Sequence, residues 1–280
     1  MQKNKTILLW DADSLCYKHK STDTLQKAIK KIDDCIKDVL AFSKADGFCM
    51  CVSRGKYFRH NISNTYKANR GTTVLPWIEA SKEYLIAKYK AVHFSALEAD
   101  DVIKYFYKLE NLYFSETSGE LLINPNEKSN LSFILVSQDK DLLKSIEGRH
   151  INPNKKTGKD TWEIVWTETS KNEAILFEWQ AMIIGDTADN ITGLPGKGPA
   201  WTEKYINNIK DLKEIINIIF FEYLKTYGVS NGIYNFQKNY RHLHILENED
   251  DFIREVSYIP EPSKLNINFI NIKPDIECLF

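Results

Sequence analysis

The 280-residue sequence has little of what marks secreted, membrane or zinc-binding proteins. Its five cysteines are odd in number and form no C-x-x-C pair, which argues against both a disulfide framework and a zinc site. No apolar run reaches the ~18 residues of a membrane span, and the first residues lead into a strand pattern instead of a signal peptide. We therefore expect a globular, cytoplasmic protein with reduced thiols.

Net charge is also nearly absent, at −1, so charge alone indicates no polyanionic partner. One stretch nevertheless lacks acids altogether. Residues 54–70 carry six Lys, Arg or His side chains, interleaved with Tyr57, Phe58 and Tyr66. Basic residues mixed with aromatic ones suit phosphate contact and base stacking. A solvated surface face is the simpler alternative for this run.

Three acids, Glu98, Asp100 and Asp101, open an apolar helical pattern at residues 95–106. Ser95, three residues before Glu98, predicts a capping box, and helical spacing places Glu98 and Asp101 on one face. Acids in a first turn also stabilise a helix through its macrodipole, which is the simpler interpretation. Three neighbouring carboxylates repel one another, however, and oxygen clusters are what Mg²⁺ or Mn²⁺ require.

Further acids follow buried strand patterns. The apolar run at residues 6–10 ends in Asp11, and the run at residues 131–136 leads to Asp139 and Asp141. Because ligand sites of open α/β sheets lie at the carboxyl ends of strands, these acids and those of the helix converge on one sheet edge. Other predicted elements are a strand at 48–52, helices at 27–43, 77–89, 173–184 and within 210–246, and a surface loop at 115–130.

A glycine-rich segment at residues 185–206 reads G-D-T-A-D-N-I-T-G-L-P-G-K-G-P-A-W-T-E-K-Y-I. Asp186 and Asp189 are three residues apart and can share a face. The glycines allow close backbone approach, and Pro199 suits the first position of a helix whose unpaired amides can bind a phosphate.

These motifs, in this order, resemble those of the 5′-nuclease family, which includes phage flap endonucleases, phage 5′–3′ exonucleases and the 5′-nuclease domain of bacterial DNA polymerase I. The resemblance covers roughly residues 6–245 and is carried by L-W-D-A, F-R before Y-K-A-N-R, E-A-D-D, S-Q-D-K-D and the glycine segment. It implies an α/β fold: a PIN-like core at residues 1–180 with a mostly parallel central sheet and a helical arch at about 59–92. A helical region with a helix-three-turn-helix and a tail would occupy residues 181–280.

The resemblance also implies roles for individual residues. Two Mg²⁺ ions, or Mn²⁺ in their place, would be held by Asp11, Glu98, Asp100 and Asp101 and by Asp139, Asp141, Asp186 and Asp189. Lys67 and Arg70 match the basic pair at the foot of the arch. DNA contacts would come from Arg59 and Tyr66 and from the hairpin residues Gly193, Gly196, Lys197 and Gly198, where the family often holds K⁺.

The activity that follows is 5′–3′ exonuclease and flap endonuclease cleavage of DNA to 5′-phosphate and 3′-hydroxyl ends by a monomer. Partners would be DNA with 5′ ends, flaps or nicks, and RNA primers in RNA–DNA hybrids stay open as a second substrate. Two alternatives remain at this point: a DNA-binding relative without catalysis, and a PIN-type ribonuclease.

The sequence departs from the family pattern at two places. Ser53 stands at or beside the position of an aspartate expected after the second strand, and Lys197 stands where an apolar residue is usual. Asp13, two residues beyond Asp11, either substitutes for the missing acid or caps the segment that follows it.

Overall fold

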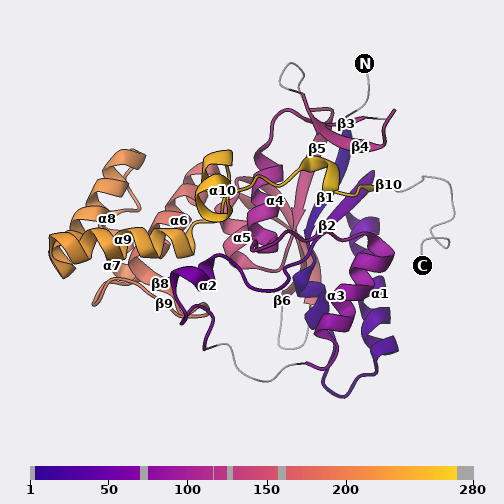
Figure 1. The fold of residues 1–280 in the computed structure, drawn as a ribbon, viewed down its shortest axis with the longest axis horizontal. Helices are drawn as coiled ribbons and strands as arrows, with labels where there is room; N and C mark the ends of the chain where they lie inside the picture. The colour runs from indigo at the N-terminus through magenta and orange to yellow at the C-terminus, as the bar shows by residue number, and fades with distance from the viewer. Residues whose placement is uncertain (1–3, 70–74, 116, 125–128, 157–161, 270–280) are drawn as a thin grey trace.

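A mostly parallel sheet of six strands lies at the centre of the protein (Figure 1). The structure, a computed structural model, describes residues 4–69, 75–115, 117–124, 129–156 and 162–269. Four strands run parallel in the order β2-β1-β5-β6, and β10 and β7 add antiparallel edges. Their bounds are β1 Lys5–Asp11, β2 Gly47–Cys51, β5 Leu131–Val136, β6 Gly148–Lys156, β7 Trp162–Thr169 and β10 Asn268–Phe269.

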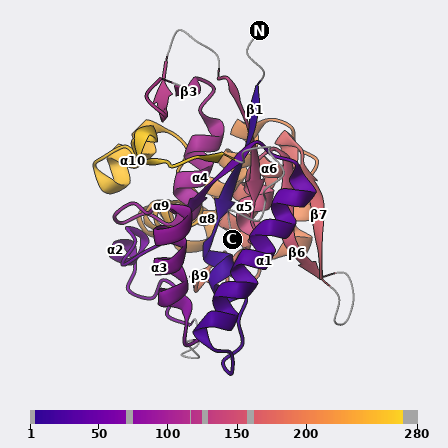
Figure 2. The ribbon, with the colours of Figure 1, turned by 90° about the vertical axis from the view of Figure 1, so that its right-hand side faces the viewer.

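Helices cover both faces of the sheet, because the side chains of β1 alternate between two cores. Ile7 and Leu9 pack with α4 (Ala99–Lys108) and the C-terminal helix α10 (Glu249–Val256). Leu8 and Trp10 face the opposite core, with α1 (Leu25–Ser43) and α3 (Ile78–Tyr89). Figure 2 shows α4 and α1 on opposite sides of β1.

Helix α1 has both end signals and a regular spacing of buried residues, so it could be predicted from the local sequence. Thr24 caps it by accepting a hydrogen bond from Lys27 N, and Lys44 ends it in the left-handed conformation. The buried positions Ile32, Ile36 and Val39 recur at helical spacing, as predicted.

A second helical region extends from the sheet (Figure 1). Its elements are α6 Lys171–Ile184, the short strands β8 Gly185–Asp186 and β9 Ile191–Thr192, α7 Pro199–Tyr205, α8 Leu212–Tyr227 and α9 Val229–Leu243. They share a third core that includes Ile183, Leu194 and Tyr223. The chain then returns to the sheet, where Leu246 and Phe252 pack in the core of α4. The division at residue 180 stays a prediction.

Two sequence interpretations need correction, and one pair of strands has no counterpart in the sequence analysis. Residues 115–130 are not simply a loop, because β3 (Leu112–Ser115) pairs with β4 (Glu120–Ile123) and buries Leu121. The pair β6 and β7 was not predicted. The capping box of α4 joins Glu98 to Asp101, so Ser95 does not cap the helix.

The remaining elements are short: η1 Asp13–Tyr17, α2 Arg59–Ile62, α5 Lys140–Ser145 and η2 Pro262–Lys264. Within the ranges that the structure describes, no helix is long and apolar enough to cross a membrane. The described cysteines, Cys16, Cys35, Cys49 and Cys51, are buried thiols, as expected.

Candidate metal centre and nucleic-acid interface

Asp11 and Asp139 meet at the carboxyl edge of the sheet. Trp10 pairs with Val136, so β1 and β5 end side by side and carry their acids to the same place. The Ser137 hydroxyl donates to Asp11 Oδ2 at 2.8 Å and accepts from Asp139 N at 2.9 Å. Ser137 thus ties the two acids together.

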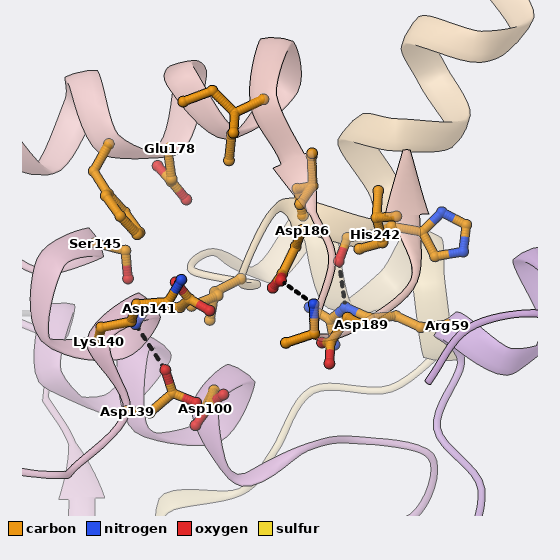
Figure 3. Close-up of a pocket in the computed structure, with 18 of the residues that line it drawn as sticks. Arg59, Asp100, Asp139, Lys140, Asp141, Ser145, Glu178, Asp186, Asp189 and His242 are labelled. Carbon is orange, nitrogen blue, oxygen red and sulfur yellow. Dashed lines mark hydrogen bonds and ion pairs between the residues drawn. The ribbon is translucent and has the colours of Figure 1, made fainter. Parts of the chain in front are cut away.

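Six of the eight predicted acids line one cavity of about 330 Å³. They come from the start of α4, the start of α5 and the β8–β9 hairpin: Glu98, Asp100, Asp139, Asp141, Asp186 and Asp189. Figure 3 shows Asp100 beside Asp139 on one side of this pocket, with Asp186 and Asp189 across from them. Asp11 is buried next to this group, where its charge acts on Asp100.

Burial and repulsion between carboxylates raise the pKa of three acids in and beside this pocket, Asp11, Asp100 and Asp141. Burial first, then the charges of Asp13 and Asp139, raise the pKa of Asp11 to about 7. Burial and the neighbouring Asp11, Asp139 and Glu98 raise the pKa of Asp100 well above its ordinary value. Burial and Asp139 raise the pKa of Asp141 to about 6. Carboxylate oxygens gathered in and beside one cavity, with Asp11 and Glu98 buried, fit hard divalent cations.

The side chains are not yet arranged around an ion. Among the described residues, no three His, Cys, Asp or Glu side chains form a ready metal site. The reason lies in their present partners. Glu98 accepts from Arg59 at 3.0 Å and from the Tyr66 hydroxyl at 2.8 Å, and it also contacts the Lys67 ammonium. Metal binding would require these contacts to change.

Asp101 does not face the cavity, contrary to the sequence prediction. Both of its oxygens accept from Arg59 at 2.7 Å, and Oδ1 also accepts from Leu246 N at 3.1 Å. The side chain is fully buried and does not line the cavity. Asp101 therefore stabilises the packing of α4 and is not positioned as a metal ligand.

The glycine segment forms a tight hairpin against the end of α6. Leu194 N donates to Ile183 O at 2.8 Å, and Gly193 lies so close to the backbone of Ile183 and Ile184 that a Cβ atom would collide with it. Gly196 has a φ of +70°, whereas Gly198 precedes Pro199 at the start of α7 with open space around it. The predicted helix start at Pro199 is confirmed.

No protein-family model matches the chain. Among solved structures, the D15 protein of bacteriophage T5, co-crystallised with metal ions, superposes with a TM-score of 0.56 at 17% identity, covering 85% of this chain and 89% of that one. The T5 5′-exonuclease with bound divalent zinc gives 0.53 at 18% identity, covering 85% and 86%. The chain has the fold of the T5 5′-exonuclease. The predicted α/β architecture is confirmed. Because the sequence identities are below 20%, these similarities establish the fold and not the chemical activity.

Two residues of the basic run at 54–70, Arg59 and Tyr66, are buried. Arg59 is 3% exposed, and beyond its bonds to Glu98 and Asp101 it donates to the carbonyls of His242 and His244. The Tyr66 ring is buried, and its hydroxyl faces Glu98. The predicted DNA contacts of Arg59 and Tyr66 are therefore corrected to structural roles. Arg70 lies outside the described residues.

Ser53, which stands where the sequence resemblance predicts an acid, has well-defined partners. Ser53 Oγ accepts from Ala99 N at 2.8 Å, at the start of α4. Ser53 N donates to both oxygens of Asp13 at 3.1 and 3.0 Å, and Lys82 Nζ lies 3.5 Å from Asp13 Oδ1. Asp13 therefore holds the end of β2, which favours a local structural role over substitution for the missing ligand.

Sequence reasoning missed several residues that line or support the pocket. Glu178 lines it from α6, His242 from α9 and Lys140 from α5. Ser137 opens the S-Q-D-K-D motif, directly after the strand pattern at residues 131–136, and that position at a strand's carboxyl end is the signal that could have identified it. Lys197, predicted to contact DNA, is 3.1 Å from Glu222 and is thus already paired.

Proposed function

We propose that the chain belongs to the 5′-nuclease family and hydrolyses DNA phosphodiester bonds at or near 5′ ends, as an exonuclease and a flap endonuclease. One observation carries the proposal. Carboxylates from β1, α4, α5 and the β8–β9 hairpin meet at one sheet edge, where burial and neighbouring acids raise the pKa values of Asp11, Asp100 and Asp141. Such a concentration of carboxylates, with Asp11 and Glu98 buried, is costly unless cations balance its charge.

The proposed ligands form two groups. Asp11, Glu98 and Asp100 would hold one Mg²⁺ ion, and Asp139, Asp141, Asp186 and Asp189 a second. Mn²⁺ suits the same oxygen donors, and the hairpin backbone is the proposed K⁺ site. When bound, a pair of divalent ions supplies charge stabilisation and a reactive water for phosphoryl transfer.

The protein's own groups would position the strand. Lys67 is a cation between Glu98 and Asp189 in the acidic pocket, so it would neutralise charge on the phosphate undergoing transfer. Arg70 is proposed beside it from the sequence resemblance. The hairpin before α7 would hold the duplex through backbone amides, since Gly196 and Gly198 have open space beside their α-carbons.

The similarity to a protein named 5′-exonuclease supports action from 5′ ends. Products would carry 5′-phosphate and 3′-hydroxyl termini, and RNA primers are proposed as further substrates. A binding protein without catalysis is the main alternative, and Ser53 in place of an acid speaks for it. The retained acidic pocket speaks against it, because a protein that only binds DNA gains nothing from acids that repel phosphate.

The test is a cleavage assay on end-labelled 5′-flap, nicked and single-stranded DNA, with a matched RNA–DNA hybrid. Each substrate is incubated with Mg²⁺, with Mn²⁺ or with EDTA. We expect cleavage at 5′ ends or flap junctions that requires the metal. Binding of the flap substrate with no cleavage in either metal would favour the non-catalytic alternative, and cleavage of RNA alone would favour a ribonuclease.

A further inference from the structure

Lys67 lies between the two halves of the acidic pocket. Its ammonium contacts Glu98 at the start of α4 and is 3.7 Å from Asp189 in the hairpin. The side chain is only 16% exposed, and its ammonium lies over the rings of Tyr57 and Tyr66, 5.5 and 5.0 Å from their centroids. Lys67 thus supplies positive charge where the acids would otherwise only repel.

The backbone fixes the lysine in this position. Lys67 has a φ of +57°, an uncommon conformation for a residue with a side chain, and its amide donates to Asp189 O at 2.9 Å. The side-chain amide of Asn190 donates to Thr65 O at 2.8 Å. The segment Thr65–Lys67 and the β8–β9 hairpin are therefore joined by hydrogen bonds at the point from which the Lys67 side chain enters the pocket.

Arg59 and Lys67 both contact the Glu98 carboxylate, and of these two side chains only Lys67 can move away from it without disrupting the core. Arg59 is buried and held by Asp101 and two backbone carbonyls, so it cannot move without disrupting the core. Lys67 has a flexible stem, a partly exposed side chain and no such bonds to its ammonium. A carboxylate oxygen that accepts from the ammonium is not open to an ion in the same direction.

We propose that Lys67 and a divalent ion compete for Glu98. In the metal-free protein, Lys67 takes the place of the cation and holds α4 to the hairpin. Ion binding releases the ammonium, which then reaches the phosphate of a bound strand. This inference rests on the proposed metal-dependent function. Because coupling between two ligands of one site is reciprocal, removing the ammonium strengthens ion binding, and adding the ion exposes the ammonium.

The first test is a calorimetric titration of the full chain with Mn²⁺ and with Mg²⁺, in the absence of DNA. Lys67→Ala and the longer Lys67→Gln are compared with wild type and with Lys140→Ala. Lys140 lines the same pocket and lies 3.7 Å from Asp141, but its side chain is 69% exposed. We expect about tenfold tighter ion binding for both Lys67 variants, since they lose a poorly screened charge, and less than about a twofold change for Lys140→Ala.

The second measurement uses the wild-type protein, so it does not depend on a variant folding. An amine-reactive reagent and mass spectrometry report labelling of each lysine with and without saturating Mg²⁺. We expect Lys67 labelling to rise several-fold with the ion and Lys140 labelling to stay constant.

The outcomes separate the two claims. Ion affinity in both Lys67 variants that equals or falls below wild type, or Lys67 labelling that does not respond to Mg²⁺, would overturn the competition and leave the proposed nuclease intact. If wild type and variants all fail to bind either ion, the proposed metal site itself is overturned.

Discussion

At the scale of single residues, Arg59 shows how a charge can serve the fold instead of the substrate. Its guanidinium joins the start of α4 to the end of α9 through Asp101 and the carbonyls of His242 and His244. An arginine suits this place because its planar fork can satisfy several acceptors at once.

Arg59→Met should destabilise the protein by about 3–5 kcal/mol, because it leaves the Asp101 carboxylate buried without its partner. Arg54→Met is the matched control, since the Arg54–Glu83 pair is solvent-accessible and should be worth less than about 1 kcal/mol. Urea unfolding gives both free energies. Equal losses in the two variants would contradict the structural role of Arg59.

His244 provides a second residue-scale prediction, based on pH. Burial lowers its pKa, but hydrogen bonds to Asp251 and Glu178 outweigh burial, and the net pKa lies above the ordinary 6.5. Its ring nitrogens are 3.3 Å from Glu178 and 3.0 Å from Asp251, and the charge of Lys104 opposes the shift. The imidazolium therefore stabilises the fold fully below pH 6.5, and this contribution is lost as pH rises through the folded pKa.

The measurement is the unfolding free energy of wild type and His244→Gln between pH 5.5 and 8.5. Taking the difference matters, since the pKa values of His150 and His242 are lowered by burial and act in the opposite direction. We expect the advantage of wild type over the variant to be largest at pH 5.5 and to shrink toward pH 8.5. A difference that grows with pH would contradict the assignment.

At the scale of elements, the β8–β9 hairpin positions Asp186 and Asp189 only because its backbone packs closely on α6. Gly193→Ala should push the hairpin away from Ile183 and cost about 1–3 kcal/mol or more. Gly198→Ala has open space and an ordinary φ, so it should leave stability within about 0.5 kcal/mol. Thermal unfolding of the two variants tests this, and similar stabilities would show that the close approach at Gly193 is relaxed in solution.

Most elements could be predicted because their patterns are local. The runs at 6–10 and 131–136 became β1 and β5, and the repeat of Ile32, Ile36 and Val39 became α1. Strands β3 and β4 could not be predicted in this way, since four residues are too short for a clear period. Strand β6 contains Pro153 near a register shift, and such a sequence does not resemble a regular strand.

The contacts of individual side chains could not be predicted from the sequence, because they depend on distant parts of the chain. The acids at Asp100 and Asp101 are adjacent and chemically alike, yet one faces the cavity and the other faces Arg59. That choice depends on where the C-terminal chain crosses α4, which local periodicity does not encode. Ser53 is similar, because its partners Asp13, Lys82 and Ala99 come from three separate elements.

At the scale of the whole molecule, the pocket exists because the chain passes the carboxyl edge of the sheet repeatedly. Acids separated by up to 178 positions, from Asp11 to Asp189, are brought near one another by β1, β5, α4 and the hairpin. The same arrangement places Lys67 among them. We therefore propose that this acidic pocket is a metal-dependent catalytic centre for DNA cleavage.

Asp139→Asn tests that claim most directly. Asparagine still caps α5, as Asp139 does by accepting from Asp141 N, so the fold should persist. Asp34→Asn, on the exposed face of α1, is the control for loss of one acid. Single-turnover cleavage of a 5′-flap DNA in Mg²⁺ is measured together with affinity for the same DNA in Ca²⁺. We predict that Asp139→Asn slows cleavage more than about a hundredfold while DNA affinity is equal or higher, and that Asp34→Asn changes neither. Cleavage by Asp139→Asn at a rate close to wild type would contradict the account.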